Sequence, residues 1–224
     1  MLHVYAVIPA HQDVPGVETL RCGDVAAAFR RDAAPPAPPT AERVAAHARV
    51  VGSIMARHPL LPARFGTAFP DEAPLRDALA RHHDALLAGL KRVSGCVELG
   101  VRALWPHAAT NPPPLPAPTG RDYMLARAAE ERRRQERQRA AEDVGKRIHP
   151  PLAELARDAT HRVLPAPDTP IVAAYLVPRD DMEHFRRRVT QLDDAHDDVT
   201  LICTGPWPPY HFAPALGHEE AARA

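Results

Sequence analysis

Hydrophobic and polar positions along the first third of the chain predict strands followed by helices. Residues 2–8 form a short apolar run, rich in β-branched residues, that stops at Pro9 and predicts a buried strand. Residues 17–31 predict one or two further strands around a turn at Gly23-Asp24, although residues 25–29 could equally begin a helix.

Two amphipathic helices are expected next. Thr40 is typical of a helix N-cap, and Asp71 is a second candidate cap. Apolar faces with the 3.6-residue period follow each cap, at Val44, His47, Ala48, Val51, Ile54 and Met55, and at Leu75, Leu79, His82, Leu86, Leu90 and Val93. The second helix ends before Gly95, and alternation over 97–105 predicts a strand. This order of elements predicts an α+β domain over residues 1–105.

The second half of the chain predicts another α+β domain, with long helices and a short sheet, over residues 120–212. Residues 106–119 contain six prolines and are expected to be a linker, and 213–224 a flexible tail. The predicted order is a largely polar helix, a second helix, a strand, a helix and a strand, at 121–146, 152–163, 171–177, 182–192 and 199–203.

A proline- and aromatic-rich segment, residues 204–212, follows the last predicted strand. Its three prolines fix φ and remove backbone donors, which predicts a stiff, extended segment that does not continue a central strand. The segment could close the core of its own domain or offer a docking surface to another protein. We expect Trp207 to be structural, and Tyr210 and Phe212 are the candidate partner-binding residues.

Composition and charge exclude several classes of partner. Basic and acidic residues number 28 each, so no net charge attracts the protein to nucleic acid or to an acidic membrane. Cys22, Cys96 and Cys203 have neither a CxxC pair nor zinc-site spacing, and reduced thiols suit a cytoplasmic protein. The first residues lack the basic region of a signal peptide and no stretch approaches eighteen apolar residues, so we expect a protein that is neither secreted nor membrane-spanning.

We recognise no catalytic, cofactor-binding or metal-binding motif in the sequence. We therefore expect no enzyme activity, catalytic residue, cofactor or metal. The glycines lack the spacing of a phosphate-binding loop, and the only serines, Ser53 and Ser94, are not in a nucleophile elbow. The acidic stretch 193–198 is interpreted as a solvated loop, and of the adjacent pair His82-His83 one is expected to be half-buried and the other solvated. Arg64 and Glu98 are charged residues within apolar motifs, which predicts that they form a buried structural ion pair.

Five motifs in one order give the chain a specific resemblance to a known family. They are Val4-Tyr5-Ala6-Val7, Leu61-Pro62-Ala63-Arg64-Phe65-Gly66-Thr67, Glu98-Leu99-Gly100-Val101, Gly120-Arg121-Asp122-Tyr123-Met124-Leu125-Ala126-Arg127 and Thr204-Gly205-Pro206-Trp207-Pro208-Pro209-Tyr210-His211-Phe212. With these motifs the chain resembles the GvpF/GvpL family of gas vesicle accessory proteins. His211 departs from the pattern, because a small polar residue is expected before the phenylalanine.

The resemblance implies a fold and a function. It implies two α+β domains, the N-terminal one a modified ferredoxin-like fold, in a non-enzymatic protein of gas vesicle assembly or a minor vesicle component. Its implied partners are the hydrophobic shell protein GvpA and other accessory vesicle proteins, with no nucleic acid or membrane. Two alternatives remain open. One is a small-ligand sensor built on ferredoxin-like domains, with a pocket at the domain interface. The other is an enzyme of unrecognised type that would have to use Glu98, Arg64 or residues 193–198, and a deep pocket with convergent polar groups would favour it.

Overall fold

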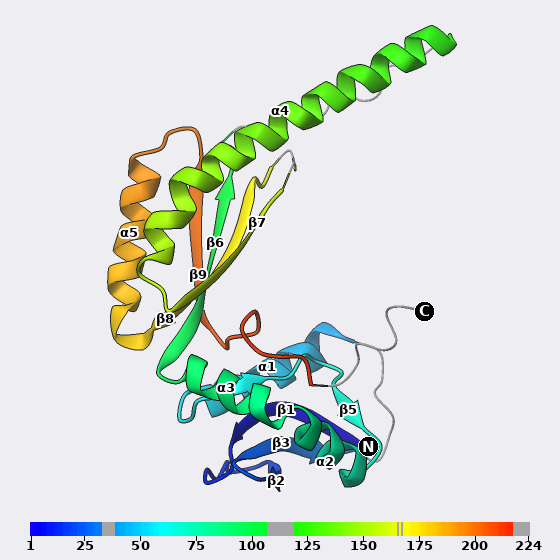
Figure 1. Cartoon of the computed structure of the whole chain (residues 1–224), viewed down its shortest axis with the longest axis vertical. Helices are drawn as coiled ribbons and strands as arrows, with labels where there is room; N and C mark the ends of the chain where they lie inside the picture. The colour runs from blue at the N-terminus through cyan, green and yellow to red at the C-terminus, as the bar shows by residue number, and fades with distance from the viewer. Residues whose placement is uncertain (33–38, 107–118, 165, 167, 217–224) are drawn as a thin grey trace. The chain divides into compact units, whose positions relative to one another are not determined.

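The computed structural model describes residues 1–32, 39–106, 119–164, 166 and 168–216. Its helices and strands confirm the predicted α+β class. The chain forms two compact units: residues 1–98 with 206–224 are the first, and residues 99–205 are the second. Figure 1 follows the elements of each unit in chain order.

An antiparallel sheet forms the centre of the first unit. Its strands are β1 (Leu2–Pro9), β2 (Glu18–Cys22), β3 (Val25–Arg31), β4 (Leu61–Pro62) and β5 (Ala68–Phe69), in the order β2-β3-β1-β4, with β5 also paired with β1. Gly23 forms the β2–β3 turn with φ of 58°, and a Cβ there would lie 2.8 Å from Nε2 of His83. The strand interpretation of residues 25–29 is therefore confirmed, and the helical alternative is wrong.

Helices pack on this sheet through alternate residues of β3. Ala26 and Ala28 form a core with Val51 and Ile54 of α1 (Ala41–Met55). The intervening residues of β3 are also buried and point to the other face, and α2 (Glu72–Arg81) and α3 (His83–Val93) both contact this strand. Thr40 caps α1 as predicted, because its hydroxyl accepts a hydrogen bond from the Arg43 N–H.

The single helix predicted between the cap Asp71 and Gly95 is wrong, because the chain forms α2 and α3 instead. The break lies at His82, whose φ of −105° and ψ of 10° are not helical. Leu75 and Leu79 are buried before the break and Leu86 and Leu90 after it, so both segments keep their apolar face in the core. The apolar period continues across the break, which is why the sequence does not reveal it.

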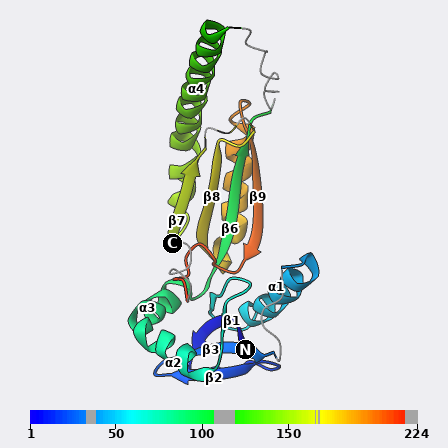
Figure 2. The same cartoon turned by 90° about the vertical axis from the view of Figure 1, so that its right-hand side faces the viewer.

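A four-stranded sheet forms the second unit. Its strands are β6 (Cys96–Leu104), β7 (Asp158–Val163), β8 (Ile171–Pro178) and β9 (Thr200–Trp207), in the order β7-β8-β6-β9. A 3₁₀ turn, η1 (Arg179–Asp181), leads into α5 (Met182–Asp194). Figure 2 shows α5 behind this sheet, and side chains of α5, of α4 (Gly120–Ala153) and of three strands share one core.

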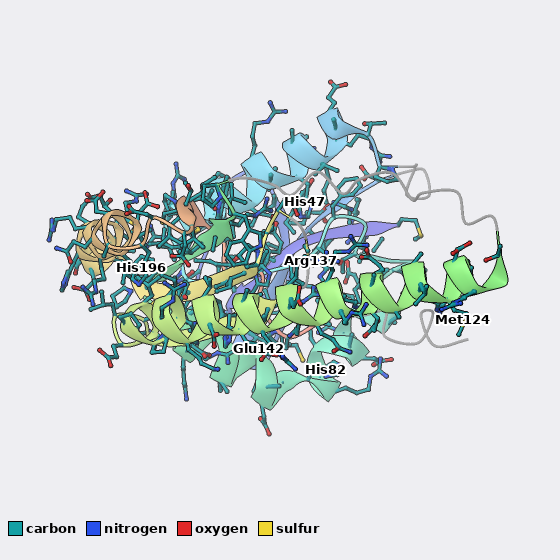
Figure 3. All side chains as sticks on the ribbon, turned by 90° about the horizontal axis from the view of Figure 1, so that it is seen from above. His47, His82, Met124, Arg137, Glu142 and His196 are labelled. Atoms are coloured by element: carbon teal, nitrogen blue, oxygen red, sulfur yellow. The ribbon has the colours of Figure 1, made fainter. Side chains whose placement is uncertain are left out.

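Only the C-terminal part of α4 is anchored in this core. Its buried residues are Ala141, Val144, Gly145, Ile148 and Leu152, and no residue of α4 before position 141 is buried. The first part of the helix extends past the ends of the strands (Figure 1), and Met124 lies in this projecting part, whereas Glu142 lies nearer the sheet (Figure 3). This agrees with the polar pattern of the sequence, since a helix without a buried face projects from the body that holds it.

The second helix predicted over residues 152–163 is wrong. The first helix continues through Pro150 and Pro151 to Ala153, and residues 158–163 form the edge strand β7. Ile148 and Leu152, one helical turn apart, both lie in the core, and their burial holds this turn in place although the prolines remove two backbone donors.

The predicted domain boundaries also need correction. The first unit ends at Glu98 instead of 105, so most of β6 belongs to the second unit. Residues 206–216 belong to the first unit, whereas residues 204–212 were assigned to the second domain. Leu216 is buried, which contradicts a flexible tail starting at 213. Residues 107–118 of the predicted linker and 217–224 of the tail lie outside the described residues, and the ferredoxin-like character of the first unit stays a prediction.

Candidate partner-binding site

The C-terminal segment, residues 206–216, changes from strand to turn within a few residues. β9 includes Pro206 and ends at Trp207, and it is an edge strand, where a missing backbone donor is tolerated. After Pro208 and Pro209 the backbone folds back, with hydrogen bonds from the Tyr210 N–H to the Pro208 carbonyl (2.8 Å) and from the Phe212 N–H to the Pro209 carbonyl (3.2 Å). The segment predicted to be extended is therefore an edge strand up to Trp207 and a turn after Pro208 and Pro209.

A buried carboxylate anchors this turn. Glu98, only 5% exposed, accepts hydrogen bonds from the backbone N–H of His211 (2.9 Å) and from its ring Nδ1 (2.7 Å). Because a carboxylate only accepts, the proton of the second bond is on Nδ1. The Arg92 guanidinium of α3 donates to the carbonyl of Phe212, so two side chains of the first unit hold consecutive residues of the segment.

A pocket of about 390 Å³ lies beside the anchored turn, within the first unit. One side is the loop 62–67 that follows β4, and the other side is Tyr210 with residues 213–216. Gly66 has φ of 90°, a conformation that suits glycine, and it lets this loop turn back toward β5. Most lining side chains are apolar, and Arg64 is the one formally charged side chain among the residues that line the pocket.

Two histidines, His3 and His47, contact the loop 62–67 and support it. His47 of α1 (Figure 3) is 4% exposed. Its Nε2 atom lies 3.0 Å from the carbonyl oxygen of Ala63, and its Nδ1 atom lies 3.0 Å from Nε2 of His3. The carbonyl accepts, so the His47 proton is on Nε2 and His3 donates to Nδ1. The Phe65 ring packs edge-on against both imidazoles at 5.7 Å between centroids. Burial lowers the pKa of each histidine, which favours the neutral form of both rings.

The predicted Arg64–Glu98 ion pair is wrong. Arg64 is exposed, and the two oxygens of Glu98 are bonded to His211 instead. Glu98 is buried and partnered, as a charged residue in an apolar motif must be, but its partner lies 113 positions later in the chain. The sequence offered one signal for His211, namely its departure from the expected family pattern.

The roles expected of the three aromatic residues are partly reversed. Trp207, expected to be structural, is 52% exposed, whereas Phe212, a candidate contact residue, is 4% exposed. Tyr210 lines the pocket and is half-buried, and burial first and the nearby Glu98 second raise the pKa of its hydroxyl. Trp207 and Tyr210 are therefore the accessible aromatic residues of the segment, and Arg92 and His47 are supporting residues that the sequence did not indicate.

Two carboxylates of the acidic stretch 193–198 are bonded within the protein. Asp193 accepts a hydrogen bond from the Leu201 N–H (2.7 Å), and Asp198 forms a two-point pair with Arg147 at 3.1 and 2.6 Å. The Arg147 hydrogen bonds lower the pKa of the Asp198 carboxyl. Across the described ranges, no group of three His, Cys, Asp or Glu side chains is placed to hold a metal ion, and no helix is long and apolar enough to cross a membrane.

Fold and site together define an α+β protein of two units in which an anchored aromatic segment borders a pocket. Residues 1–214 match the family described as "Gas vesicle synthesis protein GvpL/GvpF". The chain therefore belongs to the GvpL/GvpF family of gas vesicle proteins, and this membership supports a role in gas vesicle assembly.

Relatives and solved structures agree with this assignment. Gas vesicle protein F2 of Halobacterium salinarum is 31% identical over 184 residues, which cover 80% of this chain and 71% of that protein. Gas vesicle protein L of a Streptomyces species is 33% identical over 187 residues, which cover 77% of this chain and 69% of that protein. The crystal structure of GvpF from an Anabaena species has the same fold, with a TM-score of 0.70 over 97% of both chains at 17% identity.

Proposed function

We propose that this protein acts in the cytoplasm and at the gas vesicle as a non-enzymatic assembly factor or minor component that binds other vesicle proteins. The small hydrophobic shell protein GvpA is the first candidate partner, and other accessory proteins follow. Family membership supports the association with vesicles, and the thiol form of Cys22, Cys96 and Cys203 suits a reducing compartment.

The anchored C-terminal segment is the observation that carries this proposal. Trp207 and Tyr210 are accessible on a backbone that prolines and the bonds from Glu98 and Arg92 already fix. Aromatic side chains contribute large contact areas, and a preformed backbone loses little conformational entropy when a partner binds. This surface therefore suits recognition of an apolar protein partner.

The two alternative functions have less support from the pocket. The lining residues that the structure describes contain no carboxylate, histidine, cysteine or serine, so the hydroxyl-bearing residues Thr67 and Tyr210 would have to act there without a base of these types beside them in the lining. The pocket lies within the first unit, whereas the sensor hypothesis expected a site at the domain interface. A protein-binding surface fits these residues better than either alternative.

Capture of co-encoded vesicle proteins by the tagged full chain tests the proposal. We expect Trp207→Ala and Tyr210→Ala to weaken capture by at least about tenfold, as aromatic hot spots do. Tyr123→Ala, which removes an exposed aromatic side chain from α4, is the matched control and should leave capture unchanged. If both site variants are folded and capture every vesicle protein as well as wild type, this surface is not the binding site.

A further inference from the structure

The pocket beside Tyr210 combines an apolar wall with a single accessible cation. Pro62, Phe65, Pro214 and Leu216 are among its apolar residues, and Leu216 itself is buried. Arg64 lines the same space and is exposed. None of the other lining residues carries a carboxylate that could pair with its guanidinium.

We propose that this pocket receives an acidic side chain, Asp or Glu, that lies within an apolar segment of another vesicle protein, with Arg64 as the residue that binds the carboxylate. The inference rests on the proposed function and names the chemistry of the partner. An arginine fork matches a carboxylate in geometry and charge, and the pair gains strength where apolar groups exclude water around it. Tyr210, whose side chain carries a hydroxyl, lines the same pocket.

Charge complementarity identifies the ligand as an acid. In the loop 62–67, the N–H of Ala63 donates to the Tyr5 carbonyl and the N–H of Thr67 donates to the Arg64 carbonyl. Two backbone donors of the loop are therefore occupied, and Arg64 is the formally charged side chain that lines the pocket. We therefore assign the carboxylate to the Arg64 guanidinium, and blocking the partner's C-terminus distinguishes that source from a side-chain carboxylate.

The pocket is also preformed on both sides, which suits a binding site. His47 fixes the loop at the Ala63 carbonyl, and Glu98 fixes the turn at His211. Its volume of about 390 Å³ lies within the range of pockets that bind small groups, roughly 300–1,000 Å³. A single acidic residue with its apolar neighbours is of suitable size for this space.

A small probe tests the site without any vesicle protein. In NMR titrations of the full chain, 3-phenylpropanoate should shift the Arg64 side-chain Nε–H and the Tyr210 ring signals, because it carries an apolar ring and a carboxylate. Its uncharged amide, 3-phenylpropanamide, should not shift the Arg64 signal. Equal shifts with both compounds, or no shift with either, would overturn the proposal.

Charge reversal tests the partner. Arg64→Glu should weaken capture of the vesicle protein by about tenfold to a hundredfold, and Arg49→Glu, at an exposed position of α1, should not. Changing one internal acidic residue of the partner to arginine should restore capture by Arg64→Glu. Wild-type capture by folded Arg64→Glu, or no rescue by any such change, would overturn the proposal.

Two further experiments distinguish an acidic side chain of the partner from other sources of the carboxylate. Glu219 and Glu220 follow Leu216 in the sequence, so the double variant Glu219→Gln/Glu220→Gln removes the chain's own nearby carboxylates. The proposal predicts that Arg64→Glu weakens capture equally in this background, and loss of the effect would overturn it. Rescue only by blocking the partner's C-terminus would overturn it as well. If no vesicle protein binds the wild type while phenylpropanoate shifts Arg64, the site stands and the proposed function fails.

Discussion

Glu98 and His211 form a two-point contact in which one buried carboxylate accepts hydrogen bonds from both the backbone and the ring of the same residue. The distances are 2.9 Å to the N–H and 2.7 Å to Nδ1. Glu98 lies on β6, and His211 lies in the turn beside the pocket. The contact therefore attaches the C-terminal segment to the first unit at the point where Tyr210 lines the candidate site.

Removing this carboxylate should release the segment. We predict that Glu98→Ala lowers the free energy of unfolding of the first unit by roughly 1–3 kcal/mol, because the donors of His211 lose a buried acceptor. Glu98→Gln keeps one acceptor oxygen and should have an intermediate effect. Urea unfolding measures the stability, and limited proteolysis around residues 206–216 measures the release. Unchanged stability and cleavage in Glu98→Ala would contradict the anchoring role.

Trp207 and Phe212 should respond differently to truncation. Phe212 is 4% exposed, so Phe212→Ala should cost roughly 3–5 kcal/mol through lost burial and a cavity. Trp207 is 52% exposed, and Trp207→Ala should change the stability by at most about 1 kcal/mol. Thermal or urea unfolding of the two variants compares them directly. A large loss for Trp207→Ala would restore the structural role that the sequence suggested for this residue.

Local patterns predicted most elements of the fold, because each buried face repeats with the period of its strand or helix. They did not reveal the break at His82, since the leucines on either side keep the same period. They also misplaced the end of α4, because tertiary burial of Ile148 and Leu152 outweighs the local signal of Pro150-Pro151. Boundaries that depend on packing are therefore the weak point of such a prediction.

Contacts between residues far apart in the chain could not be predicted from the sequence. Glu98 was correctly identified as a residue that needs a partner, but its neighbours in sequence indicated Arg64 and not His211. The return of residues 206–216 to the first unit likewise depends on contacts made across more than 100 positions. The aromatic segment could be recognised from its composition, whereas the exposure of each aromatic residue required the three-dimensional structure.

The two parts of α4 should differ in dynamics. Residues 141–152 are anchored in the core, and residues 123–139 have no buried side chain among them. We predict fast amide hydrogen exchange over 123–139 and strong protection over 141–152, because opening the first part breaks no core contact. Hydrogen exchange with mass spectrometry measures this difference.

A matched pair of substitutions on α4 tests the same point. Val144→Ala removes a buried side chain and should destabilise the second unit by roughly 1.5–3 kcal/mol. Met124→Ala changes an exposed side chain and should stay within about 0.5 kcal/mol. Equal protection along the whole helix, or a large effect of Met124→Ala, would mean that the projecting part is covered in solution.

Acid should destabilise the first unit through His3 and His47. Burial lowers the pKa of both residues, and although Asp32 raises the pKa of His3, Arg43 and Arg30 lower it further. The unfolded chain therefore takes up protons near the ordinary pKa of about 6.5, and the folded chain does so only at lower pH. Since the unfolded state binds more protons in this window, stability is complete above pH 6.5 and falls as the pH decreases toward the folded-state values.

A histidine variant makes this prediction specific. Protonation of both rings would also place two cations 3.0 Å apart and remove the acceptor at Nδ1 of His47. We expect wild-type stability, measured by urea unfolding between pH 7.5 and 5, to fall with decreasing pH, and His47→Gln to have a lower stability with a weaker pH dependence. His11→Gln changes an exposed histidine of the same unit and should keep the wild-type slope. An unchanged slope in His47→Gln would show that the pair does not set the acid response, because the proton uptake of His47 is absent from that variant.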